Sequence, residues 1–307
     1  MEFYIIFDIG GTSIKYAVMD KAAEILEKGS YKTPMTDIDD FFNKMVVIIK
    51  QFSKQYNIIG IAISAPGAVD CESGIIGGES AIRYIHGPSF KEELSKRTGL
   101  CVELENDANC AALAEVWSGA AKEAMDSLFI IVGTGIGGAI VKDKRIHHGY
   151  HTHGGEFGFA IMEYNIDQMK LVTWSKSGST IELVNSVCAR KGLSNEELDG
   201  KRIFELAEAG DQDCIEELDK FYFRLAIGVY NLQYIYDPEV IVIGGGISER
   251  EEIILEINKH IDRIIEKGGN TNVRPKVVRC HFGNAANMVG ALYHYISRHE
   301  RGVEGEV

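Results

Sequence analysis

The chain has 307 residues, 45% of them hydrophobic, and a formal net charge of −13 at pH 7. This length is enough for two domains with sizeable cores, and the acidic surface excludes nucleic acid and anionic membranes as expected partners. No stretch reaches the roughly 18 apolar residues of a membrane span, and we see no signal peptide before the first strand, so we expect a cytoplasmic protein.

The stretch 3–18, FYIIFDIGGTSIKYAV, predicts two strands joined by a glycine turn. The strands are Tyr4–Phe7 and Ile14–Val18, and Asp8 ends the first of them. Glycines let the backbone come close to a bound group, and successive N–H groups in such a turn form a concavity that accepts anions. We therefore expect this turn to bind phosphate and Asp8 to hold a metal ion.

The rest of the first half alternates between predicted helices and strands. One strand runs into the tight turn Ala65-Pro66-Gly67, and a later strand delivers the polar cluster Glu105–Asn109. Ligands of α/β sheets bind at the carboxyl ends of strands, which is where Asn106 and Asp107 fall. Either residue could be the N-cap of the next helix, or Asp107 could be a general base, because a sugar hydroxyl does not ionise near neutral pH. The predicted elements are helices 37–56, 89–97 and 111–117 and strands 58–64 and 101–104.

A second glycine-turned hairpin at 128–141, LFIIVGTGIGGAIV, repeats the pattern of the first. The repetition suggests two related halves facing one phosphate chain. Gly133, Gly135 and Gly138 also match the dinucleotide-binding fingerprint, which requires a helix immediately after the glycines. Here Ala139–Val141 continues as a strand, and this disfavours NAD binding.

The second half continues the alternation of strands and helices, so the predicted class is α/β. Ser194 with Glu197, and Ser248 with Glu251, have the spacing of capping boxes and predict two helix starts. Backbone N–H groups at Gly244–Gly246 suit an anion or the edge of a nucleotide, unless this segment is a plain tight turn. We place the boundary between the halves near 117–126 and expect the last helix to pack on the first half. The predicted helices are 179–191, 194–209, 214–236, 248–266 and 285–297, and the strands are 240–243 and 277–279.

The loop from His147 to Phe159 is rich in glycine and histidine. Glu156 can accept two hydroxyl hydrogen bonds, which suits a polyol ligand, and a solvated loop glutamate is the alternative. The four histidines of this loop resemble metal ligands, but no cysteine lies nearby in the sequence, which favours a solvated loop over a zinc site. The six cysteines of the chain are scattered and form no C-x-x-C pair, which indicates reduced thiols. The histidines are His147, His148, His151 and His153.

Together these motifs resemble those of the ROK family (repressors, open reading frames, kinases) of actin-like sugar kinases, over nearly the whole chain. Asp8–Lys15 is similar to the family's first phosphate motif, Gly133–Gly138 to the second and Gly244–Gly246 to the adenosine motif. Ser64–Gly67 and Glu105–Asn109 resemble its sugar-side segments. The resemblance implies an α/β, two-lobed actin-like (ribonuclease H-like) ATPase fold. One lobe would be 1–118 plus 285–307, and the other 119–284.

The same resemblance implies a homodimeric kinase that transfers the γ-phosphate of ATP, with Mg²⁺, to a sugar hydroxyl, usually the 6-hydroxyl. Asp107 would be the general base, and Asp8 would hold Mg²⁺ with ATP, directly or through water. The implied ATP-binding residues are Asp8, Gly10, Gly11, Thr12, Lys15, Gly133, Thr134, Gly135, Gly138, Gly245 and Gly246. The implied sugar-binding residues are Ser64, Pro66, Gly67, Asn106, Asp107, Glu156 and Phe159.

The sequence departs from the family pattern around a zinc loop that many members carry. Tyr164–Ser177 contains no cysteine, Phe159 stands where the pattern has a histidine, and Ser175 falls where a glutamate often follows the loop. We therefore expect no zinc, and an apolar face near the anomeric end of the sugar that tolerates a β-linked group. With this face, and with similarity in 81–83, 154–159 and 230–232, the chain resembles the bacterial β-glucoside kinases of the family.

Other functions remain open from the sequence. Glucokinase and N-acetylmannosamine kinase are alternatives within the family. A sugar-responsive repressor of the family carries a winged helix before the first phosphate motif, whereas only seven residues precede Asp8 here. A non-catalytic sugar-binding regulator is disfavoured by the presence of Asp8 and Asp107, and an ATP turnover assay would distinguish it from a kinase.

Overall fold

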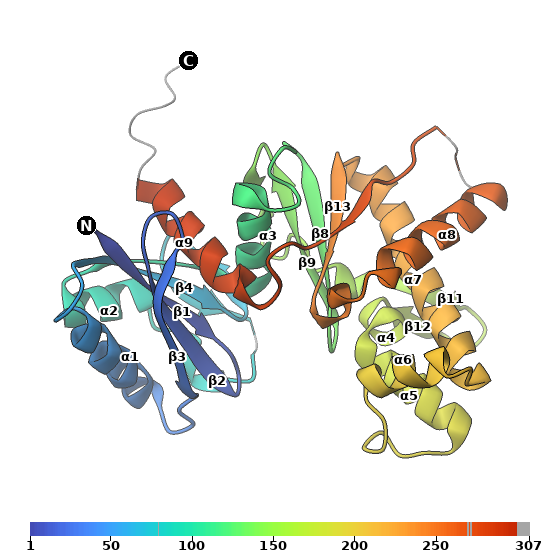
Figure 1. The fold of residues 1–307 in the computed structure, drawn as a ribbon, viewed down its shortest axis with the longest axis horizontal. Coiled ribbons are helices and arrows are strands. Elements are labelled where there is room, and N and C mark those ends of the chain that lie inside the picture. The colour runs from blue at the N-terminus through green and yellow to red at the C-terminus, as the bar shows by residue number, and fades with distance from the viewer. Residues whose placement is uncertain (79, 269, 271, 300–307) are drawn as a thin grey trace. The chain divides into compact units, whose positions relative to one another are not determined.

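A computed structural model of the protein describes residues 1–299 except 79, 269 and 271 (Figure 1). The chain forms two compact units. Unit 1 contains Met1–Lys122, His148–His153 and the described residues from 284 onward. Unit 2 contains Glu123–His147 and the described residues of Gly154–Gly283. Each unit is built around a five-stranded sheet.

The sheet of unit 1 has the strand order β3-β2-β1-β4-β7. β2 is antiparallel to β1 and β3, and β4 is parallel to β1 and β7. The register sets Asp8 beside Lys15 and Ser64, and Ser64 beside Glu105. Polar residues therefore line the carboxyl ends of the three parallel strands, the edge at which α/β sheets bind ligands. The strands are β1 (Phe3–Ile9), β2 (Ser13–Met19), β3 (Ile25–Lys32), β4 (Ile58–Ala65) and β7 (Cys101–Asn106).

Helices cover both faces of this sheet (Figure 1). Because side chains alternate along a strand, α1 and α2 pack on the face that includes Phe7, and α3 and α9 on the face that includes Ile6. α3 and α9 lie so close that a Cβ atom at Gly290 would stand 1.7 Å from the carbonyl oxygen of Cys110. α9, the last helix of the described chain, thus belongs to the packing of unit 1. The elements are α1 (Ile38–Phe52), α2 (Phe90–Thr98), α3 (Asp107–Ser118), α9 (Ala286–His299), β5 (Ala68–Asp70), β6 (Ile75–Gly77) and η1 (Arg83–Ile85).

The sheet of unit 2 repeats this arrangement with the order β10-β9-β8-β13-β14. β9 is antiparallel to β8 and β10, and β13 is parallel to β8 and β14. The two related halves that the glycine hairpins indicated therefore share one strand topology. The strands are β8 (Ser127–Val132), β9 (Ile136–Lys142), β10 (Arg145–Ile146), β13 (Val240–Gly244) and β14 (Val277–Arg279).

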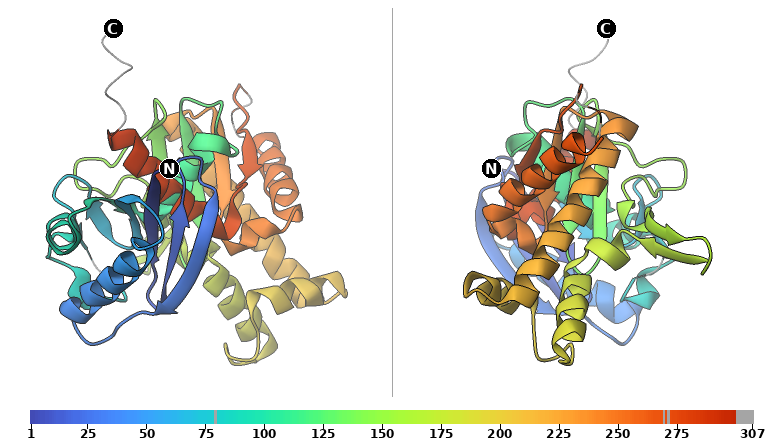
Figure 2. Two further views of the ribbon diagram at one scale, coloured as in Figure 1. Left: turned by 60° about the vertical axis from the view of Figure 1, so that its left-hand side comes forward. Right: turned by 90° about the vertical axis from the view of Figure 1, so that its right-hand side faces the viewer.

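The core of unit 2 packs β8 and β13 against four helices, α5 to α8. The β11–β12 hairpin, which the sequence analysis did not predict, stands out from the rest of unit 2 (Figure 2). None of the helices in the described part of the chain is long and apolar enough to cross a membrane. The remaining elements are α4 (Ser175–Gly178), α5 (Thr180–Lys191), α6 (Gly200–Glu208), α7 (Gln212–Tyr236), α8 (Glu252–Glu266), β11 (Ile161–Asn165), β12 (Lys170–Thr173), η2 (Phe157–Phe159), η3 (Gly246–Glu249) and η4 (Gly283–Ala285).

Three predicted helix starts are wrong. α3 begins at Asp107, four residues before the predicted start, because the polar cluster itself forms its first turn. Ser194 and Glu197 bond to one another in a turn, but α6 begins at Gly200, where the side chain of Asp199 accepts from the third backbone N–H. The hydroxyl of Ser248 donates to the carbonyl of Gly245 within a short 3-10 turn, so α8 begins only at Glu252.

Candidate functional site

Asp8, near the end of β1, is held in one orientation by unit 1. Its Oδ1 atom accepts hydrogen bonds from the Ser64 hydroxyl at 3.0 Å and from Nδ2 of Asn287 on α9 at 3.1 Å. Its Oδ2 atom lies 3.8 Å from Nζ of Lys15. Ser64 is fully buried, and its hydroxyl is directed to Asp8. The two carboxylate oxygens therefore differ: two hydrogen bonds hold Oδ1, and Oδ2 lies beside the ammonium group of Lys15.

The glycine turn after Asp8 is braced by Thr33, which is buried. The Thr33 hydroxyl donates to the carbonyl of Gly10 at 2.7 Å, and its backbone N–H donates to the carbonyl of Thr12 at 3.0 Å. A Cβ atom at Gly10 would lie 2.8 Å from the carbonyl oxygen of Ser13, so this turn requires glycine there. Gly11, Thr12 and Lys15 remain exposed at its tip.

Asn106, rather than Asp107, is the N-cap of α3. Its Oδ1 atom accepts from the backbone N–H groups of Ala108 at 2.9 Å and Asn109 at 3.2 Å, and its Nδ2 donates to the carbonyl of Gly67 at 3.0 Å. Gly67 itself has φ +94 and follows Pro66 at the end of β4. Asp107 is the first residue of α3 and is partly exposed, so its carboxylate stands at the positive end of the helix dipole.

Glu105, the residue before this cap, forms an ion pair that the sequence analysis missed. Its carboxylate is fully buried, and Nε2 of His148 donates to Oε2 at 2.7 Å. Burial alone would raise the pKa of Glu105, but the hydrogen bond from His148 and the nearby His294 lower that pKa to about 2. The same hydrogen bond raises the pKa of His148, against the effect of its partial burial. His148 is therefore not the solvated loop residue that was expected, whereas its neighbours His147, His151 and His153 are exposed.

Unit 2 contains a cavity of about 900 Å³ where two glycine motifs meet. Gly133, after β8, and Gly246, after β13, both line this cavity, and a Cβ atom at either position would meet nothing within 4 Å. Thr180 at the start of α5 fixes the first motif, because its hydroxyl and its N–H both donate to the carbonyl of Gly133, at 2.6 and 2.9 Å. The two glycines therefore leave open space for a ligand.

Other glycines of these motifs, among them Gly138 and Gly245, allow close packing within unit 2. A Cβ atom at Gly138 would lie 2.2 Å from the carbonyl oxygen of Phe129, and one at Gly245 would lie 2.2 Å from that of Val132. At Gly135, a Cβ atom would be 3.3 Å from the Ser175 hydroxyl, and Thr134 is exposed beside it. The sequence pattern assigned all of these glycines to ATP binding and could not separate those that line the cavity from those that allow close packing.

The walls of this cavity combine apolar side chains with polar groups from α5, α6 and the turn after β13. Such a composition suits a flat ring with a polar edge. The guanidinium of Arg250 lies 4.1 Å from the centre of the Phe204 ring and pairs with Glu208 and Glu252 at 3.0 and 2.9 Å. Sequence reasoning missed this wall because it is assembled from residues far apart in the chain. The lining includes Val184, Asn185, Asn195, Leu198, Asp199, Lys201, Phe204, Ile247, Glu249 and Arg250.

Glu156 and Phe159 belong to unit 2 and are exposed, with 74% of the Phe159 surface accessible. The glycine frame around them is rigidly packed. Gly155 has φ +95, and a Cβ atom there would lie 2.6 Å from the carbonyl oxygen of Gly138. Both side chains therefore project from a segment that is fixed against β9.

The sequence model of the ROK family matches residues 4–297 of this chain. A β-glucoside kinase of Listeria monocytogenes is 33% identical over 297 residues, which cover 96% of this chain and 98% of that protein. The structure of a ROK family protein of Streptococcus pneumoniae TIGR4 in complex with sucrose is 36% identical, covers 97% of this chain and 99% of its own, and has a TM-score of 0.89. A ROK family glucokinase of Streptomyces griseus, in complex with glucose and AMPPNP, is 26% identical and covers 94% of this chain and 98% of its own, with a TM-score of 0.76. These similarities confirm the actin-like α/β fold predicted from the sequence.

Proposed function

This chain belongs to the ROK family and is a carbohydrate kinase, and we propose that it transfers the γ-phosphate of ATP to the 6-hydroxyl of a β-glucoside. The observation that carries the kinase mechanism is the placement of Asp107. Its carboxylate stands where β7 ends and α3 begins, partly exposed, beside Asn106, which is the N-cap of α3. A carboxylate at the end of a parallel strand lies at the edge where α/β sheets bind ligands, and this placement supports a chemical role for Asp107.

In this mechanism Asp107 is the general base. The acceptor hydroxyl oxygen attacks the γ-phosphorus as its proton passes to the Asp107 carboxylate, and the bond from phosphorus to the bridging β–γ oxygen breaks to release ADP. Such a base contributes about 10²–10⁴-fold to the rate. The bond from Asn106 to the carbonyl of Gly67 fixes the base segment against the turn after β4. Gly67, Pro66 and Asn106 thus form the sugar side of unit 1 in this proposal.

The cavity of unit 2 is the proposed adenosine site. Gly133 and Gly246 leave room for the nucleotide, and the exposed glycine turn at Thr134 is of the kind that accepts a phosphate. Unit 1 offers a second phosphate turn at Gly11 and Thr12, with the positive charge of Lys15 beside it. The glucokinase relative in complex with AMPPNP supports this use of ATP.

Asp8 fits the magnesium ion that accompanies ATP. Mg²⁺ prefers oxygen ligands and is held through one or two carboxylates together with substrate phosphates. Oδ1 of Asp8 accepts from Ser64 and Asn287, and Oδ2, which lies 3.8 Å from Nζ of Lys15, would face the ion, directly or through water. When bound, Mg²⁺ neutralises charge that develops on the β- and γ-phosphates.

A β-glucoside is the proposed acceptor because Phe159 presents an exposed ring where the family pattern has a histidine. A ring accepts no hydrogen bond from a free anomeric hydroxyl, but it packs well against a substituent on that oxygen. The β-glucoside kinase relative supports the same choice. Glu156, from the same segment, would accept hydrogen bonds from the hydroxyls of the sugar ring.

The test is a coupled assay of ADP release across glucose, cellobiose, an aryl β-glucoside and N-acetylmannosamine. We expect the highest kcat/KM with the β-glucosides. A preference for glucose or N-acetylmannosamine would refute the acceptor while leaving the kinase assignment intact. Sugar binding by calorimetry with no turnover of ATP would instead identify a non-catalytic regulator.

A further inference from the structure

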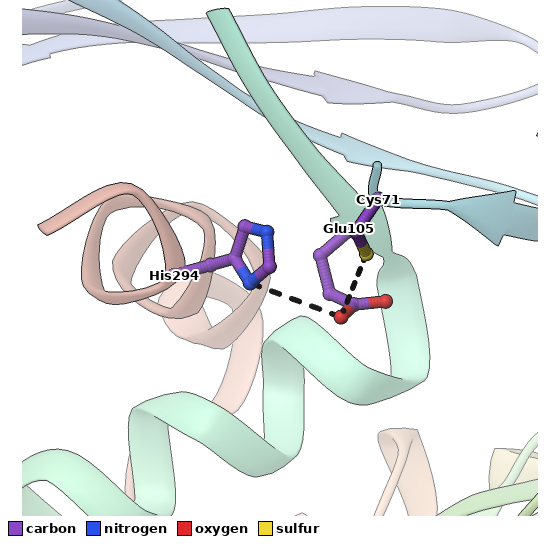
Figure 3. A group of neighbouring side chains, drawn as sticks. All are labelled: Cys71, Glu105 and His294. Atoms are coloured by element: carbon purple, nitrogen blue, oxygen red, sulfur yellow. Dashed lines mark hydrogen bonds and ion pairs between the residues drawn. The ribbon is translucent and has the colours of Figure 1, made fainter. Parts of the chain in front are cut away.

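Unit 1 contains a buried cluster of metal-ligating side chains that the proposed kinase mechanism does not use. Cys71 lies in the turn after β5, Glu105 at the end of β7 and His294 on α9, and Figure 3 shows the three side chains converging. They are 8%, 0% and 7% exposed, and one donor atom from each lies within 4.8 Å of the others. His148 adds a fourth donor, because its Nε2 lies 2.7 Å from Oε2 of Glu105 and 3.7 Å from Sγ of Cys71.

We propose that this cluster binds a single zinc ion, which fixes the start of the segment that carries Asp107. The ligands would be Cys71, Glu105, His148 and His294. One thiolate, one carboxylate and two imidazoles are a donor set typical of tetrahedral Zn²⁺. Metal–ligand bonds of 2.0–2.3 Å in a tetrahedron separate the donor atoms by about 3.3–3.8 Å.

Three of the donor separations match this requirement. Sγ of Cys71 lies 3.3 Å from Oε2 of Glu105 and 3.7 Å from Nε2 of His148, and Nδ1 of His294 lies 3.8 Å from Oε2 of Glu105. The exception is the hydrogen-bonded separation of 2.7 Å between Glu105 and His148. His148 sits at the partly exposed side of the cluster, so it is the ligand with room to move back as an ion enters.

Glu105 is already arranged to give one oxygen to a metal. Its Oε1 atom accepts from the backbone N–H of Asn106 at 2.7 Å and from Nδ2 of Asn109 at 3.0 Å. These bonds hold the carboxylate in place and leave Oε2 directed to Cys71, His148 and His294. Hydrogen bonds explain why the side chains of Cys71 and His148 lie beside Glu105. They do not explain the position of His294, because the 3.8 Å between its Nδ1 and Oε2 of Glu105 is too long for a hydrogen bond.

The second nitrogen of His294 has the environment of a metal-bound imidazole. Nε2 is buried and has no hydrogen-bond partner among the described residues, and it lies 3.9 Å from Oε2 of Glu103. Metal-bound histidines commonly donate their other N–H to a carboxylate, which fixes the ring. Lys91 and Arg298 hold Glu103 at 2.8 and 3.0 Å, so a small rotation of His294 would complete that bond.

A divalent cation would also reverse the electrostatics of Cys71. Burial and the charge of Glu105 raise the pKa of the Cys71 thiol. A bound metal deprotonates a coordinating thiol outright and offsets the buried negative charge. The ion would join β7, α9 and the segment 148–153. Its ligand on β7, Glu105, lies two residues before Asp107. The site shares no residue with 164–177, the segment on which the expectation of no zinc rested. The proposal therefore revises that expectation with a separate set of donors.

The test is titration of untagged, full-length protein with Co²⁺, together with elemental analysis after dialysis. We expect one Co²⁺ per chain with a thiolate-to-cobalt charge-transfer band, and about one zinc in protein prepared with zinc. Cys71→Ser should abolish the band, and His294→Gln should weaken Co²⁺ binding by more than the 10–100-fold typical of a lost outer-shell partner. Cys188→Ser and His260→Gln change a buried thiol and a buried imidazole of unit 2 and should leave both signals unchanged.

The wild-type protein decides the proposal even if a variant fails to fold. Absence of a saturable one-to-one Co²⁺ complex, or a complex without the charge-transfer band, would overturn it. A band that persists in folded Cys71→Ser protein, or one that is lost in Cys188→Ser, would overturn it as well. Because these signals do not depend on turnover, failure of the kinase proposal would leave them unaffected.

Discussion

The sharpest test of the proposed mechanism is Asp107→Asn. The substitution keeps the size of the side chain and an oxygen that can accept from the N–H of Ala108, a bond of 2.8 Å in the wild type. It removes only the negative charge and the ability to take a proton. Asn106 still caps α3, so the geometry of the segment should be retained.

The structure separates the two costs of this change. Removing a negative charge from a helix N-terminus costs about 0.3–1 kcal/mol of stability, which shifts Tm by a few degrees at most. Loss of a general base lowers kcat by about 10²–10⁴-fold, equivalent to about 2.7–5.4 kcal/mol of transition-state stabilisation. The catalytic effect is therefore larger than any effect through the fold.

The assay is steady-state ADP release. The Kd values of ATP and the sugar are measured by titration calorimetry, and Tm is measured by differential scanning calorimetry. We expect a reduced kcat with both Kd values near those of the wild type. Asp39→Asn is the matched control, because Asp39 is an acidic residue in the first turn of α1 in the same unit. Near-normal kcat in Asp107→Asn, or an equal loss in Asp39→Asn, would refute the role of Asp107 as base.

Three further substitutions test the packing, the nucleotide cavity and the acceptor. Gly290→Ala should lower Tm by several degrees, because overpacking between α3 and α9 costs about 1–3 kcal/mol. The control Gly200→Ala, in open space at the start of α6, should preserve or raise Tm. Equal Tm values for the two variants would contradict the close packing of α3 on α9. Gly246→Leu places a side chain in the cavity and should raise the KM for ATP about tenfold, equivalent to about 1.4 kcal/mol, with the KM for the sugar unchanged. An unchanged KM for ATP would show that adenosine does not bind in this cavity. Phe159→His should shift the kcat/KM ratio about tenfold toward glucose and away from a β-glucoside, and an unchanged ratio in folded protein would show that the ring does not contact the acceptor.

Local sequence patterns were sufficient for the strands that flank the two glycine turns, but not for β3, β5, β6 and β10. The apolar runs on either side of Gly10 and Gly133 predicted β1–β2 and β8–β9, because alternation and turn chemistry act within a few residues. The same local logic placed Asp107 at a strand end. It failed at Ser194–Glu197, where Asp199 provides a competing cap, and at the exposed β11–β12 hairpin.

Only the tertiary structure decided which groups share a site. Asn106 rather than Asp107 became the N-cap because the carbonyl of Gly67 on the neighbouring segment accepts from its amide. Asn287 reaches Asp8 across almost the whole chain, and His148 reaches Glu105 from a loop that looked solvated. A periodic pattern specifies the conformation of a segment from its own residues, whereas these contacts arise when distant segments pack against one sheet, so their chemistry is set by the fold and not by spacing along the chain.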